Sequence, residues 1–293
     1  MHRNRLTRHS VLRKTVQFAS LLATNLHLSG WVTGNIFTGA SKVAMIPGLH
    51  CYSCPSSVLA CPVGSLQSIL AAPGFWGILA SGRADALIVF AVVGFIATVG
   101  LVAGRFACGW LCPFGLLQDL LYKIPFPRMS FNDSLRPAKY VMLLLFVFGL
   151  PAFLRPVAGG AGDPWFCKVV CPAGTSLAGW PLVSTSDGAF QIGFLFWWKS
   201  AVAFVILLWA VTVERPFCKA LCPLGAAWGV LGKVSVFQMH VSDACISCGK
   251  CGEVCPMGIE IYKNPGSAEC IRCGRCEKVC PVDAISHSIR AKT

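Results

Sequence analysis

Four long apolar segments alternate along the chain with short segments rich in cysteine and proline. The apolar segments are Val16–Phe37, Leu87–Phe106, Lys139–Leu154 and Phe194–Val213. A helix needs about 20 residues to cross the hydrocarbon core of a bilayer, so this pattern predicts four transmembrane helices. Residues 236–293 are more polar and follow a different, cysteine-rich pattern.

The composition also indicates a membrane protein. Only 13% of the residues are charged and the mean hydropathy is +0.65, whereas soluble domains carry about 25% charged residues. The first apolar segment is long and no small-residue cleavage site follows it, so we expect an uncleaved span. No Walker loop, dinucleotide fingerprint or Ser-His-Asp arrangement occurs, and the sequence does not support nucleotide-driven or hydrolytic catalysis.

Positive charges gather on one side of the expected spans. They precede the first span and lie between the second and third, at Arg3, Arg5, Arg8, Arg13, Lys14, Arg105, Lys123, Arg128, Arg136 and Lys139. Because Lys and Arg stay on the cytoplasmic side, we expect a multi-pass protein of a bacterial inner membrane with both termini in the cytoplasm. The charges flank the spans and form no single patch, so we expect no nucleic-acid partner.

Eight cysteines near the C-terminal end form two copies of one motif. Each copy reads C-x2-C-x2-C-x3-C-P, the spacing of bacterial two-cluster ferredoxins, in which the fourth cysteine binds the other cluster. The motif predicts one 4Fe–4S cluster on Cys245, Cys248, Cys251 and Cys280, and a second on Cys270, Cys273, Cys276 and Cys255. Zinc is the alternative, because C-x2-C pairs also form tetrahedral thiolate sites. Two nearly identical quartets that each precede a proline favour iron–sulfur clusters.

A longer repeat relates two halves of the apolar region. Cys61-Pro-Val-Gly recurs as Cys171-Pro-Ala-Gly, and the segment Arg105–Gly115 recurs as Arg215–Gly225, each 110 residues later. Such self-similarity indicates one structural unit that occurs twice. Two copies in the same orientation predict a pseudo-twofold axis along the membrane normal. We therefore expect an α-helical membrane protein with two parallel two-helix repeats, residues 1–125 and 126–235, followed by an α+β ferredoxin module, 236–293.

This repeat brings further cysteines together on each side of the membrane. On the inner side we expect a third iron–sulfur cluster on Cys108, Cys112, Cys218 and Cys222, two from each half. On the outer side the candidates are Cys51, Cys54, Cys61, Cys167 and Cys171, one more than a cluster needs. Ser57 takes the place that corresponds to Cys167, so the first half must supply its second ligand from one of the two cysteines upstream.

Both additional sites have an alternative explanation. Small residues often serve close helix packing in membranes, so a single C-x3-C-P segment could be structural. An oxidising outer compartment favours disulfides, and Cys51–Cys54 or Cys167–Cys171 could be bonded there. Clusters at both sites would lie near opposite edges of a core about 30 Å thick. Over that distance a quinone, a haem or a partner's cofactor would have to bridge them.

These motifs resemble the membrane ferredoxin-type quinol dehydrogenase family of NapH and MauN, with a related domain in the NosR polyferredoxins. The resemblance rests on the four spans, Cys108-Gly-Trp-Leu-Cys112-Pro, Cys218-Lys-Ala-Leu-Cys222-Pro and the two C-terminal quartets. It implies an electron-transfer subunit of a membrane redox complex, with quinone as substrate and a soluble or peripheral redox protein as partner. Two alternatives remain: a redox-sensing regulatory polyferredoxin, and a membrane anchor in which only the C-terminal ferredoxin is active. The outer cysteines depart from the family pattern.

Other side chains are candidates for supporting roles. Quinol oxidation would need a proton acceptor, and Asp119, Glu214 and His50 lie beside cysteine segments. Asp119 also suits a helix-end carboxylate, and Glu214 suits an ion pair with Arg215. His27 fits a packing or hydrogen-bonding role better than haem ligation, since no other span holds a partner histidine. Five basic residues surround the ferredoxin motifs. They would stabilise the reduced clusters and attract an acidic partner, or they would form a solvated face. They are Lys250, Lys263, Arg272, Arg275 and Lys278.

Overall fold

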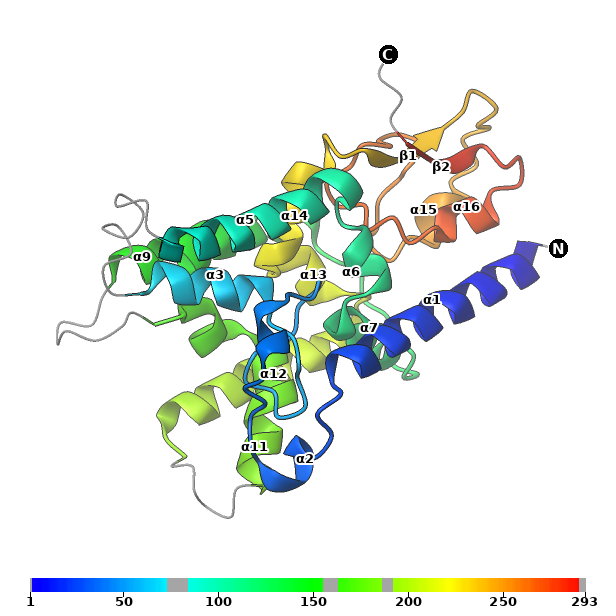
Figure 1. The fold of residues 1–293 in the computed structure, drawn as a ribbon. Coiled ribbons are helices and arrows are strands. Elements are labelled where there is room, and N and C mark those ends of the chain that lie inside the picture. The colour runs from blue at the N-terminus through cyan, green and yellow to red at the C-terminus, as the bar shows by residue number, and fades with distance from the viewer. Residues whose placement is uncertain (1, 73–83, 155–162, 186–191, 290–293) are drawn as a thin grey trace.

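Helices make up most of the chain in the computed structural model, which describes residues 2–72, 84–154, 163–185 and 192–289 (Figure 1). The α-helices are α1 (His2–Thr24), α2 (Gly30–Thr33), α3 (Pro62–Leu70), α5 (Ala84–Ala103), α6 (Phe106–Trp110), α7 (Pro113–Leu121), α8 (Ala138–Val141), α9 (Leu150–Phe153), α10 (Pro172–Gly174), α11 (Trp180–Thr185), α12 (Phe194–Thr212), α13 (Pro216–Ala220), α14 (Pro223–Gly232), α15 (Lys250–Glu253) and α16 (Arg275–Val279). Short 3₁₀- or π-helical segments are η1 (Ala40–Val43), η2 (Asp133–Leu135), η3 (Met142–Gly149), η4 (Phe166–Val170) and η5 (Thr175–Gly179). The strands are β1 (Phe237–Val241) and β2 (Ile285–Ile289).

Four of the five Cys-Pro pairs in the apolar region mark the start of a helix, and Cys54-Pro55 does not. Cys61, Cys112, Cys171 and Cys222 are the N-cap residues of α3, α7, α10 and α14, and each has an extended backbone. Extended backbone is favoured before proline, and proline suits the first helical position because its fixed φ is already helical and it lacks an N–H. Four cysteine side chains are thereby placed at helix N-termini.

The helices of the two halves begin at positions separated by 110 residues. α13 and α14 start at Pro216 and Pro223, and α6 and α7 start 110 residues earlier. The same offset relates α3 and α10. The sequence repeat therefore corresponds to a repeat of secondary structure within the described residues.

Two described helices, Asp133–Phe153 and Phe194–Thr212, are long and apolar enough to cross a membrane. They coincide with the third and fourth expected spans. The apolar part of α5, Leu87–Ala103, lies where the second was expected and is shorter. Large apolar side chains on these helices, such as Leu144 and Phe204, are exposed. Such exposure suits a lipid-facing surface.

The first expected span, Val16–Phe37, is not a continuous helix. α1 begins at His2 and ends at Thr24, and a bend separates it from the four-residue α2. The Asn25 amide donates back to the Leu21 carbonyl at 2.8 Å and its oxygen accepts from the Ser56 hydroxyl at 2.8 Å, so polar contacts end the helix here. Arg13, expected to flank a span, is fully buried within the protein. Hydropathy alone could not show where polar contacts end this helix.

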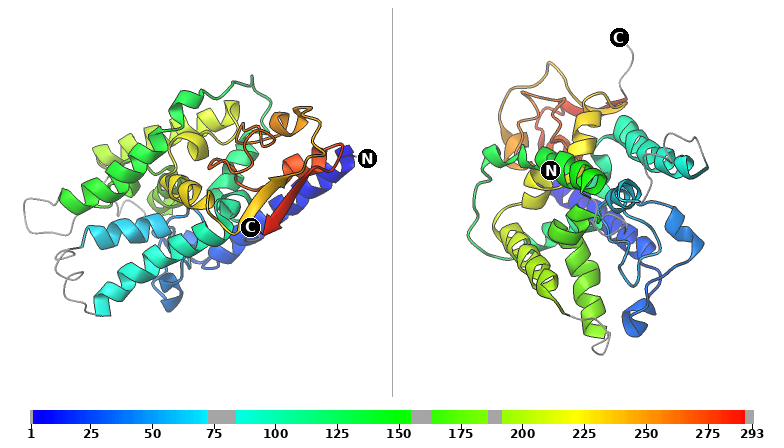
Figure 2. Two further views of the ribbon diagram at one scale, coloured as in Figure 1. Left: turned by 90° about the horizontal axis from the view of Figure 1, so that it is seen from above. Right: turned by 90° about the vertical axis from the view of Figure 1, so that its left-hand side faces the viewer.

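A small C-terminal module completes the fold. β1 and β2 pair antiparallel, from Phe237 opposite Ile289 to Val241 opposite Ile285. α15 and α16 pack together beside this ribbon, and α16 also packs on α1, so the N-terminal helix runs along the module (Figure 2). The α+β character expected for residues 236–293 agrees with this arrangement.

The module contacts the apolar region where the backbones come close together. A Cβ on Gly109 of α6 would lie 2.5 Å from the Ile271 carbonyl oxygen and 3.7 Å from the Cys273 Cα. Real Cβ atoms do not approach backbone so closely, so only glycine allows this contact.

We predict that Gly109→Ala weakens the packing of the C-terminal module against α6. The substitution should lower the melting temperature and increase hydrogen exchange in residues 237–289, because the added methyl group displaces the Ile271 backbone. Gly94→Ala in α5 is the matched control, since a Cβ there meets nothing within 4 Å, and it should be neutral or stabilising by up to about 1 kcal/mol. Equal effects of the two substitutions would contradict this account.

Candidate iron–sulfur sites

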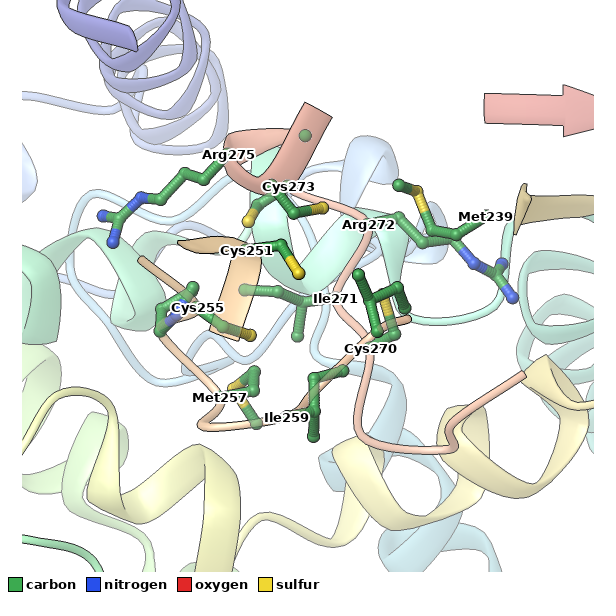
Figure 3. Close-up of a pocket in the computed structure, with 14 residues that line it drawn as sticks. Met239, Cys251, Cys255, Met257, Ile259, Cys270, Ile271, Arg272, Cys273 and Arg275 are labelled. Carbon is green, nitrogen blue, oxygen red and sulfur yellow. The ribbon is translucent and has the colours of Figure 1, made fainter. Parts of the chain in front are cut away.

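The eight C-terminal cysteines line two separate pockets. One is lined by Cys245, Cys248, Cys251 and Cys280, the first ferredoxin quartet. The other is lined by Cys255, Cys270, Cys273 and Cys276, the second ferredoxin quartet, and Cys251 reaches its edge (Figure 3). The fourth cysteine of each motif thus lies in the pocket of the other motif, as the crossover spacing predicted. Arg272 and Arg275 extend away from the second pocket.

The inner quartet, Cys108, Cys112, Cys218 and Cys222, is assembled from α6, α7, α13 and α14 and is buried. Thiol Sγ atoms accept three hydrogen bonds here. The Gln118 side-chain amide donates to Cys218 at 3.1 Å, and the Leu49 and Gly225 backbone amides donate to Cys112 and Cys222 at 3.4 and 3.3 Å. Two thiols from each half therefore meet in one buried site.

Two buried arginines cross between the halves at this site. Arg215 donates to the Cys108 carbonyl at 2.8 Å, and Arg105 donates to the Cys218 carbonyl at 3.0 Å. Each guanidinium also lies over a glycine of the opposite half, Arg215 against Gly115 and Arg105 against Gly225. The first half therefore contacts the second through Arg105 in the same way as the second contacts the first through Arg215. Two halves related by a twofold axis would make such matching contacts.

Carboxylates compensate the buried arginine charges. Asp119 accepts from Arg215 at 2.7 and 2.8 Å and from Arg13 at 2.7 Å, and Glu269 of the C-terminal module accepts from Arg105 at 2.9 Å and from Lys139. Burial by itself would raise the pKa of Asp119, but the charges and hydrogen bonds of the two arginines outweigh it and hold that pKa far below its usual range. Asp119 therefore stays ionised and does not suit the role of proton acceptor.

The outer cysteines divide into four that share a cavity and one that lies apart. A cavity of about 630 Å³ is lined by Cys51, Cys61, Cys167 and Cys171, the outer quartet, and by His50 and Lys199. Cys54 does not line it. Its thiol is within 3.5 Å of the Asn25 side-chain oxygen and 3.3 Å of the Ser56 hydroxyl. Cys51, and not Cys54, is therefore the second cysteine that the first half contributes to this cavity.

The outer and inner quartets are built with the same kind of support. Gln67 in α3 donates to the Cys167 Sγ at 3.3 Å, as Gln118 in α7 donates to that of Cys218 at 3.1 Å. Both glutamines follow the cysteine of a Cys-Pro pair by six residues, in the stretches CPVGSLQ and CPFGLLQ. This recurring glutamine was a signal in the sequence that the motif analysis missed.

Adjacent residues connect the outer and inner quartets. The Leu49 amide donates to the inner Cys112 at 3.4 Å, and the backbone of the next residue, His50, lies beside the thiol of the outer Cys61. A Cβ on Gly48 would lie 3.0 Å from the Cys112 Cα, so the loop passes directly against α7. The expectation that the two sites lie near opposite edges of the membrane core is therefore wrong. Sequence hydropathy gave no indication that this loop, residues 46–50, reaches the inner cysteines.

Several expected side-chain roles differ in the structure. Glu214 pairs with Arg275 at 2.7 Å, not with Arg215. His27 contacts the Pro55 carbonyl through Nδ1 at 2.9 Å, which confirms a hydrogen-bonding role. Burial, with a smaller contribution from Lys42, lowers the pKa of His50 to about 4, so its ring is neutral at neutral pH.

Most of the expected basic face is engaged within the protein. Arg272 is buried and donates to the Gly232 carbonyl at 2.8 Å. Arg275, Lys278 and Lys263 pair with nearby glutamates. These contacts argue against a continuous basic docking patch.

The donor chemistry of all four quartets fits iron–sulfur clusters. The donors are thiols only, and soft thiolates are the usual ligands of such clusters. Among the described residues, no three Cys, His, Asp or Glu side chains converge closely enough for a single metal ion, as zinc would need. Burial raises the pKa values of Cys112 and Cys171 to about 12, so metal loading must displace protons from these thiols.

Family models and relatives match the same regions. A model described as a 4Fe-4S binding domain matches residues 85–132 and again 194–241, and a second model with this description matches 267–286. An uncharacterized protein of Methanocaldococcus jannaschii is 30% identical over 67% of this chain and 77% of that protein. The ferredoxin-type protein NapH of Escherichia coli is 28% identical over 84% of this chain and 74% of NapH. The regulatory protein NosR of Pseudomonas aeruginosa is 30% identical over 53% of this chain and 20% of NosR. No solved structure matches the chain.

Buried cysteine quartets, a two-quartet module and these matches together define an iron–sulfur electron-transfer protein. Within that class, the chain belongs to the ferredoxin-type family of NapH and MauN.

We predict that Asp119→Asn destabilises the protein by about 3 to 5 kcal/mol, because it leaves two buried guanidinium groups without their counter-charge. A carboxyl whose pKa is depressed in the folded state stabilises that state above its ordinary pKa of about 3.9 and loses the effect only as the pH falls below it. The decrease in the free energy of unfolding caused by Asp119→Asn should therefore be constant between pH 5 and 8, as measured by thermal unfolding. Asp133→Asn, which breaks an exposed pair with Arg136, should have little effect.

Proposed function

We propose that this chain holds four 4Fe–4S clusters in one row and conducts electrons between its C-terminal module and its outer face. The observation that carries this proposal is the direct connection of the inner and outer quartets through Leu49 and His50. When bound, the clusters would supply one-electron redox chemistry. The residues of the chain hold the sites at short separations and bury the inner quartet.

The first part of the row lies within the module. Cys251 belongs to the first ferredoxin quartet and also reaches the pocket of the second. Cys255 belongs to the first motif in sequence but lines the second pocket. The crossed motifs thus keep the two pockets adjacent.

The second part joins the module to the inner quartet. Gly109, between Cys108 and Cys112 in sequence, lies against the backbone of Ile271 and Cys273. The Arg105–Glu269 ion pair holds the same two parts together. These contacts support a short path between the second ferredoxin quartet and the inner quartet.

The third part joins the inner and outer quartets. Leu49 and His50 are adjacent in the chain, and successive Cα atoms are about 3.8 Å apart. The contacts of Leu49 with Cys112 and of His50 with Cys61 therefore leave the two sulfur atoms on the order of 10 Å from each other. Tunnelling slows exponentially with distance, and this separation removes the need for a bridging quinone or haem.

The repeat and the family support a place in a membrane redox complex. We propose that residues 1–125 and 126–235 are parallel repeats in a bacterial inner membrane, with both termini in the cytoplasm. The quinone pool would exchange electrons with the row, and a soluble or peripheral redox protein would be the other partner. The similarity to regulatory protein NosR favours one alternative, a redox-sensing regulator. A regulator would hold the clusters without quinone-coupled turnover, which stopped-flow reoxidation of the reduced protein by a soluble quinone would reveal.

We predict 16 irons per chain in anaerobically purified protein, because four quartets would each bind four irons. Cys51→Ser should lower the count to about 12, whereas the matched variant Cys54→Ser should leave it unchanged, since Cys54 lies outside the outer cavity. Iron and acid-labile sulfide assays measure this count. A wild-type value of eight would overturn both added clusters, and equal losses in the two variants would contradict the assignment of Cys51.

We predict that the double variant Cys108→Ser, Cys218→Ser stops electron transfer across vesicle membranes. With a membrane-impermeant reductant on the side of the C-terminal module and an acceptor on the other side, the rate should fall at least tenfold. The spectra of the two ferredoxin clusters should remain, since their ligands are untouched. Cys54→Ser again serves as the control, and transfer unchanged by the double variant would exclude the inner quartet from the path.

A further inference from the structure

His50 is a buried polar side chain whose hydrogen-bonding capacity is unmet. Its residue is 2% exposed, and neither Nδ1 nor Nε2 has a hydrogen-bond partner among the described residues. A neutral imidazole carries one N–H donor and one acceptor nitrogen. Leaving such groups unpaired in the interior is costly, so a partner is expected.

His50 lies next to the outer cavity. His50 is one of the residues that line that cavity, together with the four cysteines of the outer quartet. The backbone around it is held in place, because the Leu49 amide donates to Cys112 at 3.4 Å, the His50 backbone lies beside the Cys61 thiol, and the Ile46 amide donates to the Ala60 carbonyl at 3.1 Å. His50 is thus held beside the cavity by the loop that connects the inner and outer quartets.

We propose that His50 donates its ring N–H to the sulfur atoms of the cluster held by the outer quartet, and that it is a positioning residue that sets the reduction potential there. This inference rests on the proposed outer cluster. A hydrogen bond to cluster sulfur stabilises the reduced state, which is the more negative one, and so raises the potential. His50 would thereby make the outer end of the row a better electron acceptor.

Only the first half of the repeat has a histidine at this position. The residue 110 positions after His50 is Gly160, which has no side chain to donate. The inner quartet also differs, because its charged neighbours are the arginines Arg105 and Arg215. Unequal surroundings of this kind would separate the potentials of two otherwise similar sites.

The test is a redox titration of the full chain, purified anaerobically and followed by electron paramagnetic resonance. His50→Phe keeps the size of the ring and removes the donor, and His50→Gln keeps an N–H donor. We expect a lower midpoint potential of the outer cluster alone in His50→Phe, restoration toward the wild-type value in His50→Gln, and 16 irons in both. His240→Phe, on the exposed face of β1, should change nothing.

The outcomes separate this inference from the function on which it rests. A wild-type count of 12 irons would remove the outer cluster and overturn both. Sixteen irons with an unchanged potential in His50→Phe would overturn the role of His50 only. Loss of four irons in His50→Phe and His50→Gln alike would show a structural role and would also overturn it.

Discussion

The burial of two arginines between the halves of the molecule is the constraint on which the structure depends. Arg105 and Arg215 are at most 1% exposed, and charge this deeply buried must be compensated. Arg215 forms an ion pair with Asp119, and Arg105 forms one with Glu269, which belongs to the C-terminal module. The same guanidinium groups bind backbone carbonyls of the inner quartet in the opposite half. One set of interactions therefore joins the two halves, the module and the inner cysteines.

The Cys-Pro pairs add groups of cysteine thiols to this arrangement. Proline fixes the start of each short helix and the preceding cysteine becomes its N-cap, so the thiol stands at the point where helices of both halves meet. A glutamine six residues further on holds a thiol of the other half in both the inner and the outer quartet. Thiols positioned by helix starts and side-chain amides are held more firmly than thiols on free loops.

Some features followed from local sequence and others did not. The two ferredoxin quartets were predictable because ligand spacing within one short motif determines which thiols can meet. The third and fourth expected spans agreed with long apolar helices, since length and hydropathy are local properties. The first expected span was wrong because α1 ends at a polar bend near Asn25. Glu214 was given the wrong partner, Arg215 in place of Arg275, because ion pairs form between segments distant in sequence.

By itself, the sequence determined the number of cysteine motifs, their spacing and the 110-residue repeat, because these are properties of residue order. It could not decide between Cys51 and Cys54, which are three residues apart and carry the same side chain. Only the tertiary structure places Cys51 in the outer cavity and Cys54 against Asn25. It also brings Leu49 and His50 between the inner and outer quartets. Distances between sites depend on how loops pack in three dimensions, and no local pattern of residues specifies that packing.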